Sequence, residues 1–289
     1  MIEVPTTNTK KDRSNNMKKW LVASLLVLVI GVLAACGGND KSDGEEGLLS
    51  DGKLTVGVTA GPHEEIVEKV QELAAKEDLT IEIKVFSDYV MPNVALDEKE
   101  IDINSFQTEP FFDHMVKDRN LDLIKVADTV TFPMGIYSDK VKEISELEDG
   151  AKIGLPSDPT NSGRALMLFE SAGLITIDEG VGINATVNDI DENKNNYEFI
   201  ELDPAQIPRQ LNELDAAAIN TNFAIDAGLS PAEDSIFIEP EDAPFSNLIA
   251  VRTESKDEEV VQQFIDLFHS DEVKQFIDEN FDGSIIANW

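Results

Sequence analysis

Short apolar runs alternate with amphipathic segments along most of the chain. Residues 54–60 form an apolar run typical of a strand, and residues 80–86 alternate apolar and polar positions as a half-buried strand does. Between them, apolar residues recur at helical spacing from Ile66 to Ala74. This spacing predicts a helix over residues 63–77.

The same rhythm continues to the C-terminus. It predicts further strands over 101–106, 122–130, 132–138, 151–156, 197–203, 216–220 and 246–254. It predicts helical segments over 109–119, 164–173, 204–214, 221–229 and 257–270, with a second amphipathic helix closing the chain. Strands that alternate with helices favour an α/β fold with mostly parallel sheets, in which ligands bind at the carboxyl ends of strands.

The N-terminal segment has the pattern of an export signal. A basic stretch begins at Met17, an apolar run of about 13 residues extends from Leu21 to Leu33, and small residues lead to Cys36. The run is shorter than the about 20 residues that a spanning helix needs. Residues 1–35 are therefore predicted to be a signal peptide, with Met17 as an alternative start.

Leu33-Ala34-Ala35-Cys36 resembles a bacterial lipobox, which implies cleavage before Cys36 and lipidation of its thiol. The alternative is a chance cysteine after a signal peptide. Cys36 is the only cysteine, so it has no internal disulfide partner. Two acyl chains would hold the protein stably at the extracytoplasmic face of the cell membrane. Residues 36–51, rich in Gly, Ser and charge, are expected to form a flexible tether.

The charge of the chain excludes some partners. The net charge is −34, although residues 1–35 carry five basic and only two acidic residues. The exported part is therefore more acidic still, and such a surface repels nucleic acid and anionic lipid headgroups. We expect no nucleic-acid partner, while the charge says little about a small ligand.

Enzyme chemistry finds little support in the sequence. His63, His114 and His269 are scattered without ligand spacing, and we expect them to be solvated or locally hydrogen-bonded. No G-x-S-x-G, P-loop or G-x-G-x-x-G pattern is present. We expect no metal, no cofactor and no enzymatic activity, although a pair of carboxylates of the glycosidase type remains open.

One arginine lies at an unexpected position. Residues 158–163 are rich in capping and turn residues and are predicted to be a loop, which places Arg164 in the first turn of the following helix. A cation is disfavoured at a helix N-terminus unless it helps the backbone N–H groups to hold an anion. The guanidinium fork suits a carboxylate. An arginine that reaches solvent, or pairs with one of the many acids, is the alternative.

Several unusual stretches carry a resemblance to a known family. They are FSDYVMPN (86–93), NSFQTEPFF (104–112), TVTFPMGIYS (129–138), NSGR (161–164), INTNFA (219–224) and APFSNLIAVR (243–252). In this order they resemble the NLPA lipoproteins, the methionine-binding, substrate-capturing subunits of bacterial ABC importers. The similarity extends over almost all of the chain that follows the signal peptide.

The resemblance implies a two-lobed periplasmic-binding-protein fold of type II, with the ligand between the lobes. One lobe would comprise residues 52–137 and 244–289, and the other 138–243. Residues 132–138 and 243–249 would be the hinge crossovers. The implied partners are an ABC permease and its ATPase, and the protein would act as a monomer.

The resemblance also implies the site. Arg164 matches the arginine that holds the ligand carboxylate, and Asn220 and Asn247 match asparagines around the amino-acid head. Tyr89 and Phe106 match aromatic residues that wall the thioether, which gains from aromatic edges. Further aromatic positions near the family pocket are Phe111 and Phe132. Core packing for the phenylalanines and turn roles for the asparagines are the alternatives.

Thr108 departs from the family pattern, because relatives carry a pocket histidine there. Phe111 also lies where some relatives have tyrosine. Threonine keeps a hydroxyl but loses reach and the option of charge. The expected ligand is L- or D-methionine. Another small amino acid or a methionine-containing dipeptide is the alternative, as is an adhesion lipoprotein that has lost transport.

Overall fold

The computed structural model of the chain describes residues 48–49, 52–240 and 243–289. The predicted signal peptide, Cys36 and most of the predicted tether lie outside the described residues. Within the described part of the chain, no helix is both long and apolar enough to cross a membrane.

The first lobe is built on a six-stranded sheet with the order β13-β4-β12-β3-β1-β2. Its strands are β1 (Leu54–Thr59), β2 (Ile81–Phe86), β3 (Ile103–Thr108), β4 (Leu123–Thr131), β12 (Ser246–Arg252) and β13 (Ile286–Ala287). β1 pairs in parallel with β2 and β3, whereas β12 lies antiparallel between β3 and β4.

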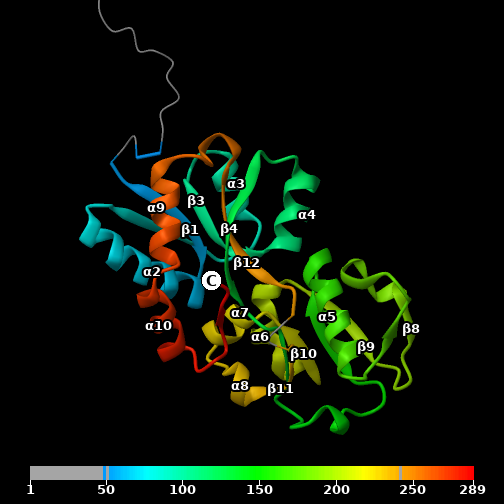
Figure 1. Cartoon of the computed structure of the whole chain (residues 1–289). Helices are drawn as coiled ribbons and strands as arrows, with labels where there is room; N and C mark the ends of the chain where they lie inside the picture. Colours follow the sequence, from blue (N-terminus) through cyan, green and yellow to red (C-terminus); the bar gives the residue numbers. More distant parts are fainter. Residues whose placement is uncertain (1–47, 50–51, 241–242) are drawn as a thin grey trace, which may run out of the picture. The chain divides into compact units, whose positions relative to one another are not determined.

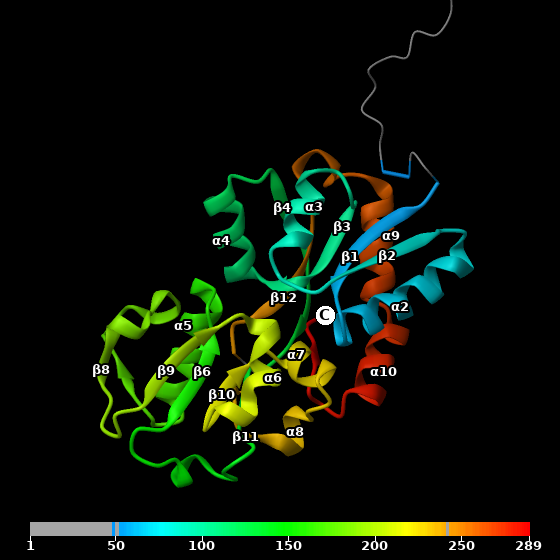
Figure 2. The ribbon, with the colours of Figure 1, turned by 180° about the vertical axis from the view of Figure 1, so that it is seen from behind.

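Helices cover both faces of this sheet, as the alternation along β12 shows. Ile249 and Val251 belong to the core under three helices, α2 (Pro62–Ala74), α9 (Glu259–Phe268) and α10 (Asp271–Asn280). Leu248 and Ala250 belong to the core under α3 (Met91–Asp97) and α4 (Glu109–Arg119). The opposite views in Figures 1 and 2 show α2, α9 and α10 together beside β1.

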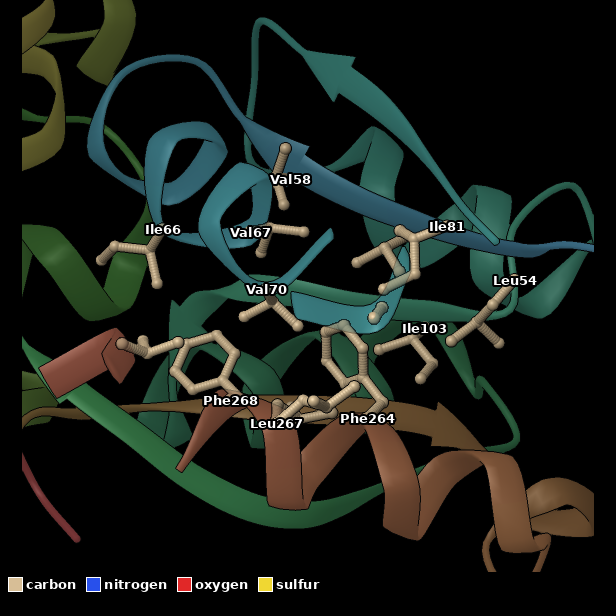
Figure 3. Close-up of a cluster of buried hydrophobic side chains, with 14 of the residues drawn as sticks. Leu54, Val58, Ile66, Val67, Val70, Ile81, Ile103, Phe264, Leu267 and Phe268 are labelled. Atoms are coloured by element: carbon tan, nitrogen blue, oxygen red, sulfur yellow. The ribbon is translucent and has the colours of Figure 1, made fainter. Parts of the chain in front are cut away.

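The larger core of the first lobe joins segments that are far apart in the sequence. Figure 3 shows Val67 and Val70 of α2 between the strands and the rings of Phe264 and Phe268 of α9. Phe264 is fully buried. Burial of such aromatic side chains holds the C-terminal helices against the N-terminal strand–helix unit.

The second lobe contains a five-stranded sheet with the order β11-β5-β10-β6-β9. Its strands are β5 (Gly135–Tyr137), β6 (Lys152–Pro156), β9 (Glu198–Leu202), β10 (Ala216–Ile219) and β11 (Ser235–Ile238). A small separate ribbon pairs β7 (Thr176–Ile177) with β8 (Ile190–Glu192).

Alternation along β10 again assigns a helix layer to each face. Ala216 and Ala218 pack in the core beneath α5 (Pro159–Ser171), and Ala217 and Ile219 pack beneath α6 (Ile207–Gln210) and α7 (Thr221–Asp226). The remaining helix is the short α8 (Pro231–Asp234). Short 3₁₀ turns occupy Ala75–Glu77, Ile144–Glu146, Gly182–Asn184, Val187–Asp189, Pro204–Gln206, Leu211–Glu213 and Thr253–Ser255.

The chain crosses between the two sheets twice. It leaves β4 at Thr131 and enters β5 at Gly135, and it leaves β11 at Ile238 and enters β12 at Ser246. The crossovers are joined to each other, since Glu239 N donates to Met134 O at 2.9 Å and Met134 N donates to the Glu239 carboxylate at 2.7 Å.

Both sheets are mixed, but most strands of each sheet run in one direction, as the prediction of mostly parallel sheets expected. β12 and β13 enter the first sheet antiparallel, and β5 lies antiparallel to both β10 and β11. The strand–helix rhythm reports only the direction of strands joined by a local crossover. It carries no signal for a strand such as β12 that returns from the other lobe.

Some predicted helices and strands differ from those in the structure. Residues 204–214 form only the four-residue α6 between two 3₁₀ turns, since Pro204 and Pro208 interrupt the helical ladder. The hydrophobic periodicity did not predict α3, β11 or β13, which have only seven, four and two residues. In contrast, α4 spans Glu109–Arg119, which are the predicted bounds.

Candidate functional site

A small pocket is lined by residues of both lobes. All eight residues expected at a binding site contribute to its lining. The lining residues are His63, Tyr89, Phe106, Gln107, Thr108, Phe111, Phe132, Asn161, Arg164, Asn220, Thr221, Asn222 and Asn247.

Aromatic rings form one side of the pocket. Tyr89, which follows β2, has its ring centroid 6.0 Å from that of Phe106 in β3 and 5.8 Å from that of Phe111 in α4. Across the lobe boundary its ring lies 4.8 Å from Phe223 of α7. Such tilted and edge-on rings make an apolar wall whose edges suit a polarizable sulfur.

Tyr89 also links the lobes by a hydrogen bond. Its hydroxyl donates to Asn222 Oδ1 at 2.6 Å. Burial raises the pKa of Tyr89 well above its ordinary value, with the charge of Asp158 as a smaller cause, so the phenol stays protonated and able to donate. Asn222 Nδ2 is buried and has no hydrogen-bond partner among the described residues.

Arg164 does not lie in the first turn of its helix, so that prediction is wrong. α5 begins at Pro159, five residues earlier, with Asp158 as its N-cap. The Asp158 carboxylate accepts from Asn161 N at 2.9 Å, and the Asp158 carbonyl accepts from Ser162 N at 2.8 Å. These bonds satisfy N–H groups at the helix start. The expected clash between Arg164 and free N–H groups therefore does not arise.

Gly163 allows the 3₁₀ turn at Gly182–Asn184 to pack closely against α5. A Cβ at this position would lie 1.9 Å from the carbonyl oxygen of Ile183, in the 3₁₀ turn that packs on α5. Only glycine allows this close approach of two backbone segments. The 3₁₀ turn therefore packs directly against α5 at Gly163, the residue before Arg164.

The carboxylate that meets Arg164 within the protein is Glu239, in the returning crossover. Arg164 Nε donates to Glu239 Oε1 at 2.9 Å and Nη2 donates to Oε2 at 2.5 Å. Nη2 also donates to Phe132 O at 2.8 Å, and the ring of Phe245 lies 4.3 Å from the guanidinium carbon. Both members of the ion pair are buried. Pairing with an acid was the alternative considered from the sequence.

The third guanidinium nitrogen of Arg164, Nη1, does not take part in these hydrogen bonds. Among the described residues, none accepts a hydrogen bond from Arg164 Nη1, while Nε and Nη2 are fully engaged. A bidentate contact to Glu239 fixes the plane of the group. The guanidinium is therefore held in one orientation, and Nη1 is left to donate to another acceptor.

Asn220 presents a buried acceptor to the same pocket. Its Nδ2 donates to Asn161 Oδ1 at 2.8 Å, and its own Oδ1 is buried without a partner among the described residues. Asn161 Nδ2 donates in turn to both carboxylate oxygens of Asp158 at 3.0 Å. Burial raises the pKa of Asp158, and the hydrogen bonds from Asn161 and Thr160 oppose this shift. An unsatisfied buried oxygen is costly and indicates a place for a donor.

Asn247 and Thr108 are paired across neighbouring strands. They face each other in the antiparallel register of β12 and β3, and both line the pocket. Asn247 is 3% exposed, so its position is not that of a surface turn residue. Threonine is therefore the residue that the pocket offers where the family pattern has histidine.

His63 corrects a prediction, because it is buried and none of the described residues forms a hydrogen bond with its ring. It is 5% exposed, lines the pocket, and packs its ring 4.5 Å from that of Phe132. Burial lowers its pKa to about 3, so the imidazole is neutral at physiological pH. His269 does match the expectation, with Nε2 at 2.8 Å from Asp128 O.

Sequence reasoning missed other lining residues besides His63. These are Asn161, Thr221 and Asn222. Each lies within a stretch that carried the family resemblance, one to three positions from a residue that was assigned a role. Buried asparagines and threonines next to a strand end were the available signal, because polar side chains are seldom buried without a partner.

A buried cluster of amides lies behind the aromatic wall. Asn93 of α3 and Gln107 of β3 exchange hydrogen bonds at 2.7 and 2.8 Å, and Asn104 Nδ2 donates to Asn93 Oδ1 at 2.9 Å. These bonds hold α3 to β3. They therefore fix the segment that carries Tyr89 relative to Phe106.

A second hollow adjoins Tyr89 and Phe111, whose side chains line both spaces. Val90 and Phe223 contribute further apolar surface to it. Tyr89 thus stands between the central pocket and this outer hollow.

The combined site is suited to binding a small ligand. It offers a held cation with a spare donor, a buried acceptor and an apolar aromatic wall, which together complement a zwitterion with an apolar tail. Among the described residues, no group of histidines, cysteines and acids is arranged to hold a metal ion.

Comparisons with known proteins agree with this architecture. Residues 54–289 match the family described as NlpA lipoprotein. The D-methionine-binding lipoprotein MetQ of Escherichia coli is 40% identical over 265 residues, which cover 90% of this chain and 95% of that protein. The Probable D-methionine-binding lipoprotein MetQ of Vibrio cholerae is 38% identical, covering 94% of this chain and all of the relative.

A solved structure shares the fold. A nutrient binding protein from Burkholderia cenocepacia bound to methionine superimposes with a TM-score of 0.80 at 43% identity. The match covers 82% of this chain and all of that one. The match extends over most of the described residues and supports the two-lobed fold of periplasmic binding proteins. On this evidence the chain belongs to the NlpA lipoprotein family.

Proposed function

We propose that the protein is a solute-binding lipoprotein that captures methionine, or a closely related α-amino acid, and delivers it to an ABC importer. The observation that carries this proposal is the buried, unpartnered Oδ1 of Asn220 in the same pocket as the unused Nη1 of Arg164. An acceptor and a cationic donor in one small pocket are what a zwitterionic head requires. Support also comes from relatives named as D-methionine-binding lipoproteins and from the relative solved with methionine.

The ligand would lie with its charged head toward the second lobe. Its carboxylate would accept from Arg164 Nη1, and its ammonium would donate to Asn220 Oδ1. Asn247, from the first lobe, would complete the head contacts. The thioether would lie against Tyr89, Phe106 and Phe111, with Thr108 and Phe132 as the remaining predicted contacts.

Capture would proceed by closure of the lobes over the ligand. We assign residues 52–131 and 246–289 to one moving unit and 135–238 to the other, since the chain changes sheet between Thr131 and Gly135 and between Ile238 and Ser246. The boundary expected at residue 137 falls after β5, which belongs to the second sheet. Closure would exclude water and strengthen the contacts to the ligand head. The hydrogen bond from Tyr89 to Asn222 would help to hold the closed form.

The predicted anchor places this activity at the membrane. Lipidation of Cys36, after removal of residues 1–35, would tether the folded body at the extracytoplasmic face through residues 36–51. The transmembrane permease and its cytoplasmic ATPase would be the partners, and the protein would reach them as a monomer. Its role would be binding and delivery rather than catalysis, in keeping with the family.

A methionine-containing dipeptide is a second candidate ligand. The hollow beyond Tyr89 and Phe111 favours it, because a rotation of Tyr89 would join that space to the central pocket. A longer ligand would then fit without a change in the residues that hold its head.

Isothermal titration of ligand-free protein with L-methionine, D-methionine and Gly-Met tests the proposal. We expect at least one of the three to bind with one site and a Kd in the micromolar range or below. If none binds below the millimolar range while another small molecule does, the methionine assignment is wrong. If no small molecule binds at all, the result favours an adhesion protein that has lost transport.

A further inference from the structure

The orientation of the Asn220 amide decides which polar atom the pocket offers to a ligand. An isolated asparagine can present either end of its amide, a donor or an acceptor, to a ligand. Which end Asn220 presents decides whether the pocket attracts an ammonium or a carboxylate. The contacts of Asn220 therefore determine the selectivity of the site.

A chain of three side chains leads from Asn220 to the start of α5. Asn220 Nδ2 donates to Asn161 Oδ1 at 2.8 Å, and Asn161 Nδ2 donates to both oxygens of Asp158 at 3.0 Å. Asp158 also accepts from Asn161 N at 2.9 Å and from the hydroxyl of Thr160 at 3.1 Å. Asn161 and Asn220 are buried, 5% and 8% exposed.

The direction of this chain follows from the chemistry of its end. An ionised carboxylate only accepts hydrogen bonds, so the nearby amide must turn its NH₂ group toward Asp158. That leaves the Asn161 oxygen facing Asn220, which must in turn present its own NH₂ group. The oxygen of Asn220 is then the atom left for the pocket, and it is buried without a partner among the described residues.

We propose that Asp158 is a positioning residue that, through Asn161, fixes Asn220 with its oxygen toward the pocket and thereby makes the site select ligands with an ammonium group. This inference rests on the proposed function, and it adds the origin of the selectivity. Asp158 would not touch the ligand. Its carboxylate would act through two amides, and the selected class would be amino acids rather than the corresponding carboxylic acids.

Asp158→Asn tests the polarity while preserving the helix cap. Asparagine caps helices as well as aspartate does. The bond from Asn161 N keeps the side-chain oxygen of residue 158 in place, so the new NH₂ group would replace the second carboxylate oxygen beside Asn161 Nδ2. The retained oxygen would still accept from Asn161 Nδ2, but a donor would replace the second oxygen, which now accepts from the same nitrogen at 3.0 Å. The loss of that bond weakens the hold on the Asn161 amide and thereby allows Asn220 to turn its NH₂ group toward the pocket.

The measurement compares two ligands by isothermal titration, L-methionine and 4-(methylthio)butanoate, which keeps the carboxylate and thioether but lacks the amino group. In the unmodified protein we expect clear preference for L-methionine. In Asp158→Asn we expect L-methionine affinity to fall about tenfold or more, the loss of a hydrogen bond to a charged group. We expect affinity for the butanoate to change less than about threefold.

Asp203→Asn is the matched control for the loss of a negative charge. The charges of Asp158 and Asp203 both raise the pKa of Tyr89, so both act on the pocket electrostatically. Asp203 is also an N-cap, accepting from Ala205 N at 3.0 Å, and it has no bond to Asn161. We expect this variant to retain the preference for L-methionine. Asn161→Ala, which removes the middle of the chain, should lose the preference as Asp158→Asn does.

The results separate the two proposals. If the unmodified protein does not bind L-methionine, the proposed function fails. If it binds, but Asp158→Asn and Asn161→Ala keep the preference within about threefold, or weaken both ligands equally, the positioning role is wrong and the proposed function stands. Thermal unfolding of each variant verifies that the compared proteins are folded.

Discussion

Replacement of Arg164 by alanine should lower both the ligand affinity and the free energy of unfolding, and the two losses can be measured separately. The guanidinium donates two bonds to Glu239 and one to the carbonyl of Phe132, and all of these groups are buried. Its removal leaves the Glu239 carboxylate buried without its partner. Breaking a buried ion pair in this way costs about 3–5 kcal/mol of unfolding free energy.

The effect on binding follows from the remaining nitrogen. If Nη1 holds the ligand carboxylate, its loss leaves that carboxylate desolvated and unpaired in the closed cleft, which costs about 2–5 kcal/mol. This corresponds to an affinity for L-methionine lower by about 100-fold or more. Titration calorimetry measures this loss, and urea unfolding measures the loss of stability.

Arg252→Ala is the matched control. Arg252 is also buried and donates to the carbonyls of Leu96 and Ile101 at 2.9 and 2.6 Å, but it does not line the pocket. We expect it to lose about 3 kcal/mol of stability through those unpaired carbonyls and its ion pair, with ligand affinity within about threefold. Unchanged affinity in Arg164→Ala, or an equal loss in both variants, would refute the assignment of Arg164.

Three further predictions concern the lobe interface, the neutral histidine and the core. Tyr89→Phe should weaken ligand binding about two- to tenfold through loss of the bond to Asn222, whereas Tyr197→Phe, whose hydroxyl accepts from Asn195 in the second lobe, should not. Because the pKa of His63 is lowered to about 3, its contribution to stability is complete above pH 6.5 and is lost as the pH falls toward 3. Between pH 7 and pH 5, urea unfolding should therefore show about 2 kcal/mol more loss in the natural protein than in His63→Phe, and an NMR midpoint of the imidazole near 6.5 would contradict this. Phe264→Ala should lower the unfolding free energy by about 3–5 kcal/mol, because the ring is fully buried in the core of the first lobe, and a loss below 1 kcal/mol would contradict that packing.

Much of the fold could be predicted from the sequence because its signals are local. α4 has a clear start at Glu109-Pro110 and a polar C-terminal end, so its bounds were predictable. The start of α5 was equally available, since Asp158-Pro159 is an N-cap followed by proline, but the cluster of turn residues up to Gly163 obscured it. The insertion of β12 between β3 and β4 joins residues more than a hundred positions apart and leaves no local pattern.

Some residues of the candidate site could likewise be predicted from the sequence, and others could not. The eight residues expected from the family resemblance meet in one pocket, while their binding roles stay predictions. Glu239 was not predictable, because it is one of 57 acidic residues and becomes the partner of Arg164 only through the tertiary path of the returning crossover. His63 looked like a surface residue near a helix start, and only the packing of Phe132 shows that it is buried.

The most direct test of the account is a crystal structure of the protein mixed with L-methionine. We predict one molecule in the central pocket, with its carboxylate on Arg164 Nη1, its ammonium on Asn220 Oδ1 and its thioether against Tyr89 and Phe106. A ligand bound with its head reversed, or bound away from these residues, would contradict the account.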